Sequence, residues 1–331
     1  MTDVNLTIAC QAYDRVQALQ SGEVRVEGCR TRFLPMRTED IFRCAYDGAQ
    51  FEVTELSMSS HILMLARGLP CQYLAIPVFP SRMFRHSAIY IRTDRGIDRP
   101  RDLAGRTVGV PEYQMTAALW ARGMLSDEYG VATSSIRWRT GGLEEPGRKE
   151  KFGLTFGDGV TVAPIASGQA LSPMLASGEI DALITARAPS CYSPGHPGVD
   201  RLFKDHRSAE EAYFRKTLIF PIMHVIGVRR DIVDRYPWVP ASLTKAFDQS
   251  KRNCMWAMYD VGAVSAALPW LGDDLARTVA VMGEDYWPYG VPANRTTLET
   301  MLRYSFEQGL SPRKLELDEL FAPGTLGDLP I

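Results

Sequence analysis

The sequence predicts a two-lobed α/β protein with a ligand cleft between its lobes. Three observations support this fold class. Short apolar runs with strand character alternate with helical patterns in the first third of the chain, which favours a largely parallel sheet covered by helices. A second series of the same kind begins near residue 89. An apolar β pattern then returns at 218–228, so the chain would cross between the lobes twice.

The first lobe is predicted to begin with alternating strands and helices. Strand patterns occur at 6–10 (LTIAC), 32–36, 51–56 (FEVTEL) and 71–79 (CQYLAIPVF). Helical patterns lie between them, at 38–48 and 57–68. Serines before the second of these helices suit N-cap positions, and Gly48 and Gly68 suit helix ends.

The second lobe is predicted from shorter elements. They are a strand at 106–110, a helix at 111–130, a strand at 136–138, a glycine-rich loop or hairpin at 141–159, a helix at 173–178 and a strand at 180–185. After the return strand, apolar residues from Leu243 to Val261 fall at helical spacing, so a long helix should follow. The last hundred residues are predicted to be mostly helical.

The two crossings predict a discontinuous first lobe. It comprises residues 1–88 and 218–331, and the inserted second lobe comprises residues 89–217. In folds of this kind, ligands bind where strand ends and helix N-termini converge. Closure about the two crossings can bury the ligand.

Composition narrows the class of protein. The chain has 331 residues and a formal net charge of −2, which predicts neither a nucleic-acid nor an anionic-membrane partner. Its six cysteines are scattered without a CxxC pair, which is typical of free thiols in a reducing compartment. We find no signal-peptide pattern and no long apolar run, and we therefore expect a cytoplasmic protein. A homo-oligomer is compatible with the sequence, which does not specify the oligomeric state.

A basic cluster follows the fourth predicted strand. Arg82, Arg85 and His86 lie within five positions, in the segment IPVFPSRMFRHSAIYIR at 76–92. Arginine presents a planar fork of donors that fits a carboxylate, and histidine can relay a proton at neutral pH. The alternative is a solvated basic turn after an edge strand.

Five segments together resemble one enzyme family. They are the stretch at 76–92, PEYQMTAALWARGML at 111–125, DALITARAP at 181–189, FPIMHV at 220–225 and DYWPYG at 285–290. In this order and spacing the chain is similar to the 4,5-dihydroxyphthalate decarboxylase family, and the resemblance extends to EQGLSPRKL at 307–315. It implies the type II periplasmic-binding-protein fold.

The resemblance also implies a reaction. One carboxylate of 4,5-dihydroxyphthalate would leave as CO2 and give protocatechuate. A hydroxyl lies para to each carboxylate, so the ring can stabilise the intermediate formed when the ipso carbon is protonated. We therefore expect no cofactor. A metal held by His86, His224 and Glu112 is conceivable, but no HxH or HExxH spacing indicates one, and we predict no metal.

Three residues are predicted to act in catalysis. We expect His86 and His224 to divide acid and base work, in an order that the sequence does not assign, and Glu112 to accept a catechol proton. The alternative for each of these residues is a structural role. A lone histidine in an apolar strand is usually a satisfied core residue, and Glu112 suits the first turn of a helix.

Most predicted substrate-binding residues lie at the ends of strands or at helix starts, whereas Asp285, Trp287 and Tyr289 are expected to form an aromatic and acidic wall beside the catechol. Arg82 and Arg85 are the first choice for a carboxylate clamp. The others are Arg187, Tyr113, Thr116, Tyr13, Arg15, Ser57, Ser59, Asp285, Trp287 and Tyr289. The small aromatic dicarboxylate is the one predicted ligand. For the aromatic residues, core packing is the alternative.

Two other functions are compatible with this fold. One is a non-catalytic cytoplasmic binding protein for an aromatic acid or a similar small anion. The other is a biosynthetic enzyme, such as one making a pyrimidine precursor, that also uses histidines in its cleft.

Overall fold

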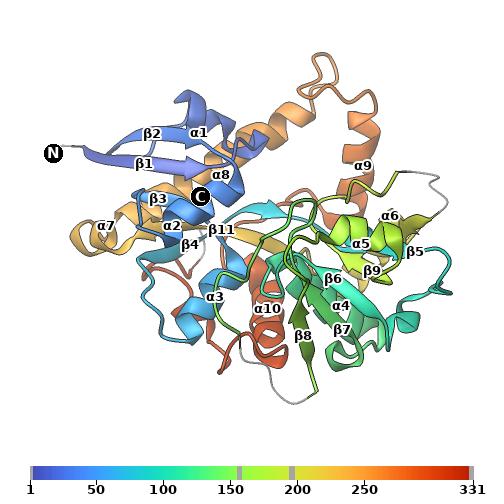
Figure 1. Ribbon diagram of the computed structural model, residues 1–331. Helices are drawn as coiled ribbons and strands as arrows, with labels where there is room; N and C mark the ends of the chain where they lie inside the picture. Colours follow the sequence, from blue (N-terminus) through green and yellow to red (C-terminus); the bar gives the residue numbers. More distant parts are fainter. Residues whose placement is uncertain (1–2, 155–158, 194–197, 328–331) are drawn as a thin grey trace. The chain divides into compact units, whose positions relative to one another are not determined.

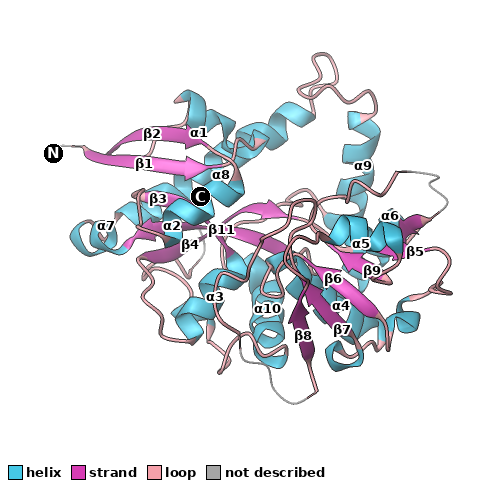
Figure 2. Ribbon diagram, viewed as in Figure 1, coloured by secondary structure: helices cyan, strands magenta, loops and turns pink. Residues whose placement is uncertain are grey.

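The structure, a computed structural model, describes residues 3–154, 159–193 and 198–327. The chain divides into two compact units. Unit 1 comprises 1–82, 222–299 and 315–331, and unit 2 comprises 83–221 and 300–314. Figure 1 traces the chain through both units, and Figure 2 separates their helices, strands and loops.

The sheet of unit 1 has five strands in the order β2-β1-β3-β11-β4. Their bounds are β1 Val4–Cys10, β2 Cys29–Pro35, β3 Val53–Ser57, β4 Tyr73–Arg82 and β11 Ile222–Arg229. Strand β1 pairs in parallel with both β2 and β3. Strand β11 is antiparallel to both of its neighbours, β3 and β4. The predicted largely parallel sheet is therefore interrupted by the strand that returns from unit 2.

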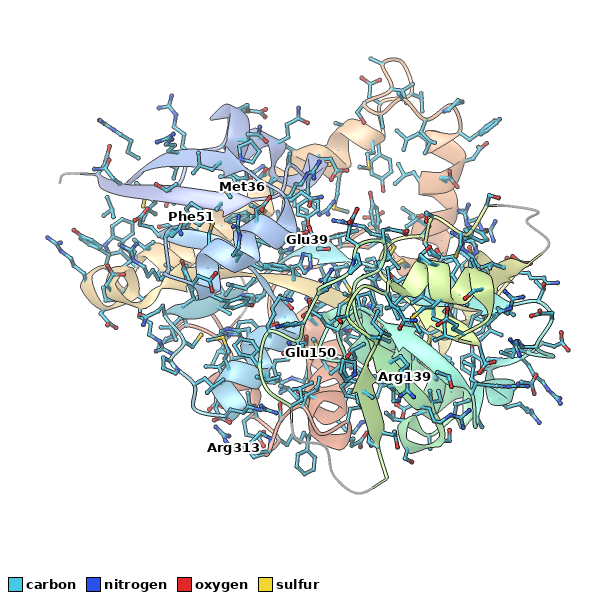
Figure 3. The ribbon with its side chains drawn as sticks, in the orientation of Figure 1. Met36, Glu39, Phe51, Arg139, Glu150 and Arg313 are labelled. Atoms are coloured by element: carbon cyan, nitrogen blue, oxygen red, sulfur yellow. The ribbon has the colours of Figure 1, made fainter. Side chains whose placement is uncertain are left out.

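Most helices of unit 1 contact this sheet, and the last of them packs on the helix before it. They are α1 Gln17–Ser21, α2 Thr38–Tyr46, α3 Met58–Ala66, α7 Arg230–Arg235, α8 Val239–Met258 and α9 Leu271–Met282. Phe42 on α2 and Phe51 form a small core cluster with Ala9 and Ile41, and Met36 packs against its edge. Met36 and Phe51 are labelled in Figure 3. This cluster supports the end of β1, from which the candidate site continues.

The sheet of unit 2 has six strands in the order β10-β5-β9-β6-β7-β8. The strands are β5 Ile89–Arg92, β6 Thr107–Val110, β7 Arg137–Thr140, β8 Thr161–Pro164, β9 Ala182–Ile184 and β10 Val199–Arg201. The neighbouring strands β9, β6, β7 and β8 run parallel. The helices are α4 Thr116–Tyr129, α5 Leu171–Ser177, α6 His206–Thr217 and α10 Arg295–Glu307, the last of which begins in unit 1.

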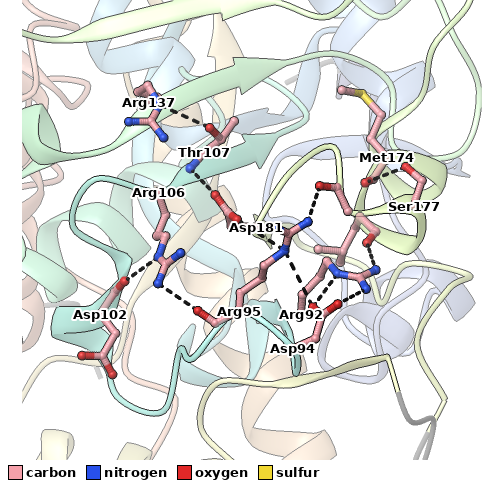
Figure 4. A network of polar contacts seen from close by, with 12 residues as sticks. Arg92, Asp94, Arg95, Asp102, Arg106, Thr107, Arg137, Met174, Ser177 and Asp181 are labelled. Carbon is pink, nitrogen blue, oxygen red and sulfur yellow. Dashed lines mark hydrogen bonds and ion pairs between the residues drawn. The ribbon is translucent and has the colours of Figure 1, made fainter.

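An arginine-rich network ties together one end of this sheet, as Figure 4 shows. Asp181, just before β9, accepts a hydrogen bond from the amide of Thr107 at the start of β6. Arg95 contacts the same carboxylate, while Arg92 pairs with Asp94. The network lies where β6 and β9 begin, which leaves the opposite, carboxyl edge for the loops that follow these strands.

The boundaries between the units differ in detail from those expected from the sequence. The chain changes units at 82/83 and 221/222, and residues 300–314 pack with unit 2 although they follow unit 1 in sequence. Two contacts explain why residues 300–314 pack with unit 2. Tyr304 packs its ring on Trp120 of α4, with centroids 5.6 Å apart, and donates a hydrogen bond to Asp127. Gly123 on α4 leaves room for that ring, because a Cβ there would clash with it.

Two predicted elements begin later than the sequence suggested. The helix expected from residue 111 begins at Thr116, and it ends as expected before Gly130, whose φ of 66° suits glycine. The return strand begins at Ile222, because Leu218 caps α6 in the left-handed region. Among the described residues, the helices are all too short or too polar to cross a membrane.

Candidate active site

The candidate site is built on the carboxyl edge of the sheet in unit 1. Strand β1 ends at Cys10, β3 ends at Ser57, and the antiparallel strand β11 begins nearby, so that His224 pairs with Ser57 on one side and Ser81 on the other. Loops that follow parallel strands gather at this edge, which is where α/β proteins bind ligands.

Two side chains from neighbouring strands meet at this edge. Glu55 on β3 pairs with Ile226, so it is a diagonal neighbour of His224 and lies on the same face of the sheet. Nδ1 of His224 lies 2.5 Å from Oε1 of Glu55. The glutamate is fully buried, whereas the histidine side chain is 18% exposed. Phe42 contacts the imidazole edge-on, with ring centroids 5.1 Å apart.

The buried carboxylate of Glu55 is held ionised by its neighbours. Burial by itself would raise its pKa, but the charge and hydrogen bond of His224, the amide of Gln11 and the hydroxyl of Tyr13 outweigh this and hold the pKa below its usual value. Gln11 donates to Oε2 at 2.9 Å and Tyr13 donates to Oε1 at 2.7 Å. An ionised carboxylate only accepts hydrogen bonds, so Nδ1 of His224 carries the proton and Nε2 faces away from Glu55.

A stacked arginine lies beside this pair. The guanidinium of Arg15 lies between two rings, 4.3 Å from the centroid of Tyr13 and 4.1 Å from that of Trp287. Its Nε donates to the carbonyl of Pro80 at 2.6 Å, and Nη1 pairs with Asp14 at 2.8 Å. These contacts fix the plane of a cation whose side chain is 15% exposed. A cation held flat in this way suits a carboxylate ligand.

The other predicted residues of unit 1 are more deeply packed. Ser57, Ser59, Arg82 and Tyr289 are buried. Arg82 donates to the carbonyl of Pro288 at 3.0 Å, and burial lowers its pKa to about 9. Asp285 pairs with Lys251 at 3.1 Å. The structure thus brings Tyr13, Arg15, Trp287 and His224 together, while Arg82 and Asp285 have structural partners.

In unit 2 the predicted residues Glu112, Tyr113 and Thr116 lie at the start of α4, beneath a loop. Glu112 is 3% exposed and pairs with both Arg148 and Lys151, each at 2.7 Å. The carboxylate of Glu150, labelled in Figure 3, accepts hydrogen bonds from the amides of Tyr113 and Gln114. The loop that bears these partners is therefore fastened across the carboxyl edge of β6.

The remaining predicted residues of unit 2 lie apart from that loop. His86 is fully buried among aromatic rings, 4.9 Å from Phe203 and 5.4 Å from Tyr213. Burial lowers its pKa to about 4, so it is neutral at pH 7. Arg85 is buried near Glu210, and burial lowers its pKa to about 10. Arg187 follows β9 and is exposed.

Glu55, the partner of His224, was not predicted from the sequence. The sequence held a signal for it, because a glutamate within the apolar strand pattern FEVTEL needs a buried partner. Cys10 was not predicted either, and its thiol donates to Oε2 of Glu55 at 3.4 Å. Burial and the Glu55 charge raise the pKa of that thiol, which makes it a poor nucleophile.

The described side chains include no group of three or more His, Cys, Asp or Glu that could hold a metal ion. Of the residues considered as a conceivable metal set, His224 belongs to unit 1, and His86 and Glu112 belong to unit 2. The prediction of a metal-free reaction is left to experiment.

Comparisons with known proteins now decide the family. No family model matches the chain. The chain is 42% identical over 331 residues to the 4,5-dihydroxyphthalate decarboxylase of Comamonas testosteroni, with 100% of both proteins covered. The chain belongs to the 4,5-dihydroxyphthalate decarboxylase family. A protein of that name from Pseudomonas putida is 45% identical over 215 residues, which cover 65% of this chain and 83% of the relative.

Solved structures confirm the predicted fold class of this decarboxylase family member. A putative periplasmic sulfonate-binding protein from Methylobacillus flagellatus superposes with a TM-score of 0.56 at 13% identity, covering 98% of this chain and 93% of its own. The alkanesulfonate-binding protein of Xanthomonas axonopodis pv. citri gives 0.51 at 12% identity, with 98% of both chains covered. At such identities the likeness shows the fold alone, which is the two-lobed α/β fold of periplasmic binding proteins.

Proposed function

We propose that this chain decarboxylates 4,5-dihydroxyphthalate to protocatechuate and CO2, with His224 as the proton donor to the ring. The observation that supports this site is the buried Glu55–His224 pair, 2.5 Å apart, at the ligand-binding edge of the sheet. The full-length relative from Comamonas testosteroni supports the reaction itself.

The substrate itself can stabilise the intermediate of the reaction. Each carboxylate has a hydroxyl group para to it. Protonation of the ring carbon that bears the departing carboxylate gives a cation that the para oxygen stabilises. The C–C bond then breaks, its electron pair restores the aromatic ring, and CO2 leaves. The enzyme must deliver one proton to carbon and hold a dianion in the right orientation.

His224 is placed to deliver that proton. With Nδ1–H bonded to Glu55, the ring presents Nε2 away from the core, and a proton on Nε2 makes the ring an imidazolium. The ionised Glu55 balances the charge of that imidazolium and fixes the orientation of the ring. After the transfer, Nε2 takes a new proton from solvent. Glu55 therefore acts as a positioning residue, and His224 touches the substrate.

Arg15 is the proposed anchor for the carboxylate that remains on the ring. Its guanidinium is fixed by stacking and by two hydrogen bonds, so little side-chain entropy is lost when an anion binds. The charge-assisted hydrogen bond would hold the retained group, while the departing carboxylate lies near His224. Tyr13 links the two parts, because its ring stacks on Arg15 and its hydroxyl binds Glu55.

The residues predicted in unit 2 have a secondary place in this proposal. Glu112 and Tyr113 begin the segment leading into α4, and Arg187 follows β9 on the same sheet edge. No step of the proposed reaction is assigned to these residues. His86 is not proposed as the acid because its ring is buried among aromatic side chains. A cytoplasmic location and independence of metals and cofactors complete the proposal.

One assay tests the function directly. Purified protein is treated with a chelator and mixed with 4,5-dihydroxyphthalate, and protocatechuate and CO2 are followed over time. Stoichiometric formation of both products is the expected result. Tight binding without product would support a binding protein instead, and activity that returns only with a divalent ion would contradict the metal-free part of the proposal.

A further inference from the structure

Strand β4 is irregular where it passes His224. Its pairing with β11 is regular up to Ile226, which lies opposite Ile76. Continued for two more residues along β11, this register would place Val78 opposite His224. The register shifts instead, and the residue paired with His224 is Ser81, three positions further along β4. The shift therefore replaces an apolar neighbour of the histidine by a residue with a hydroxyl group.

Two prolines explain why the strand bulges at this point. Pro77 and Pro80 have no amide hydrogen and cannot donate to the ladder, so a strand tolerates them at a sheet edge or in a bulge. Strand β4 is an edge strand of its sheet. Bulges are common beside active sites, where they redirect a side chain. The sequence IPVFPS at 76–81 thus accounts for the shift that brings Ser81 to His224.

The bulge also supplies backbone carbonyls to the candidate site. The carbonyl of Pro80 accepts a hydrogen bond from Nε of Arg15 at 2.6 Å, and the carbonyl of Phe79 accepts one from Nε1 of Trp287 at 3.0 Å. The guanidinium of Arg15 lies 4.1 Å from the ring centroid of Trp287. One irregular stretch of strand therefore holds both members of this stack and places Ser81 beside them.

The hydroxyl of Ser81 joins the hydrogen-bond network of Glu55. Burial and the Glu55 charge raise the pKa of Tyr13, whereas a hydrogen bond with Ser81 lowers it. A hydrogen bond lowers the pKa of a phenol when it is donated to the phenol oxygen, so Ser81 is the donor. Tyr13 in turn donates to Oε1 of Glu55 at 2.7 Å. A chain of donated hydrogen bonds thus leads from Ser81 through Tyr13 to the carboxylate that orients His224.

This chain affects which acceptor the histidine uses. The Tyr13 oxygen lies 3.5 Å from Nδ1 of His224, close enough to compete with Glu55 for the Nδ1 hydrogen. The hydrogen bond from Ser81 occupies the Tyr13 oxygen and leaves the hydrogen of that hydroxyl for Glu55. Each hydrogen bond in such a chain also polarises the next one. Glu55 is therefore the better acceptor for His224 while Ser81 is in place.

We propose that Ser81 is a positioning residue, which acts through Tyr13 and Glu55 to orient the imidazole of His224. The expected effect on turnover rests on the proposed function, whereas the orientation of His224 can be measured without turnover. Ser81 acts at a distance from the substrate, so its loss should lower kcat rather than raise KM.

The first experiment measures steady-state kinetics with 4,5-dihydroxyphthalate. Ser81→Ala should lower kcat by about tenfold and leave KM within about twofold of wild type. Ser81→Thr keeps the hydroxyl and should keep kcat within about threefold. Thr31→Ala is the matched control, because Thr31 is a half-buried hydroxyl residue on β2, opposite Leu6. A wild-type kcat in Ser81→Ala, or no rescue by Ser81→Thr, would overturn the proposal.

The second experiment tests the route through Tyr13 by a double-mutant cycle. Tyr13→Phe removes the hydroxyl that receives the hydrogen bond from Ser81. In that background, Ser81→Ala should change kcat by less than about twofold. A further tenfold loss in the double variant would show that Ser81 does not act through Tyr13 and would overturn the proposal.

The third experiment observes the ring nitrogens of His224 by NMR and requires no turnover. The chain has five histidines, and the spectrum of His224→Gln identifies the signals of this one. Ser81→Ala should shift the Nδ1 signal, whereas Thr31→Ala should leave it in place. Circular dichroism confirms that each variant is folded. An inactive wild-type protein with this shift would contradict the proposed decarboxylation and support the role of Ser81 in orienting His224. An unmoved Nδ1 signal in Ser81→Ala would overturn that role.

Discussion

Nδ1 of His224 lies 2.5 Å from a carboxylate oxygen of Glu55, and the two residues come from neighbouring antiparallel strands. Glu55 is fully buried, yet His224, the amide of Gln11 and the hydroxyl of Tyr13 hold it ionised. A buried carboxylate orienting an imidazole at a strand end is a recurrent arrangement for proton transfer.

Glu55→Gln should lower kcat by about a hundredfold or more, because the amide neither fixes the tautomer of His224 nor balances its positive charge. KM should change little, since Glu55 does not touch the substrate. Glu52→Gln is the matched control, as Glu52 precedes the same strand and pairs with Arg229. Steady-state kinetics of both variants distinguish the two glutamates. Equal activities would remove Glu55 from the mechanism.

Arg15→Lys should raise KM for 4,5-dihydroxyphthalate by about tenfold, while kcat changes less. Lysine keeps the charge but loses the planar fork and the stacking between Tyr13 and Trp287. The loss of one charge-assisted hydrogen bond corresponds to about 1.5–3 kcal/mol. Arg43→Lys on the exposed face of α2 serves as the control. An unchanged KM in Arg15→Lys would show that the carboxylate binds elsewhere.

Glu112→Gln separates a catalytic from a structural role for this residue. In the structure the carboxylate holds Arg148 and Lys151 of the overlying loop. We expect the variant to be cleaved faster by trypsin in that loop and to lose about 1 kcal/mol of stability, with a modest fall in turnover. If Glu112 accepts the catechol proton, kcat should instead fall about a hundredfold while the rate of cleavage stays unchanged.

The unfolding free energy should fall as the pH is lowered from about 6.5 to about 4. Burial lowers the pKa of both His61 and His86 to about 4 from an ordinary value of 6.5, so between these values the unfolded chain binds protons that the folded chain does not. Stability is therefore present above pH 6.5 and is lost on acidification, by at most about 3 kcal/mol per histidine.

His86→Phe should remove its share of that pH dependence. The side chain is surrounded by Tyr129, Phe203 and Tyr213, so an aromatic ring of similar size should fit. Urea unfolding of wild type and variant at several pH values between 4 and 7 measures the difference in slope. Identical slopes would mean that His86 titrates normally. A folded variant without decarboxylase activity would restore His86 as a candidate acid.

Most strands of the fold could be predicted, because apolar runs bounded by turn residues mark them directly. Local sequence patterns do not predict features that depend on tertiary contacts. Nothing in the local sequence of 300–314 indicates that Tyr304 packs on Gly123 of α4, and the segment was assigned to the other lobe. The antiparallel direction of β11 also follows from chain connectivity, which a strand pattern does not specify.

Some residues of the candidate site could be singled out from their place relative to predicted strands. Tyr13 and Arg15 were singled out because they follow a predicted strand, and His224 because it is a lone histidine in an apolar strand near the second crossing. Their roles stay predictions. Glu55 was missed because its side chain lies within the strand and becomes meaningful only when β11 pairs beside it. The role of the basic cluster at 82–86 stays a prediction, and sequence spacing does not show that Arg82 and His86 are buried.

The central claim is that His224, oriented by Glu55, protonates the ring. Its most direct test is turnover of 4,5-dihydroxyphthalate by folded, chelator-treated His224→Gln, with binding measured separately by calorimetry. The account predicts substrate affinity within about threefold of wild type and a loss of kcat of at least about a hundredfold. Protocatechuate formation at a rate close to that of wild type would contradict it.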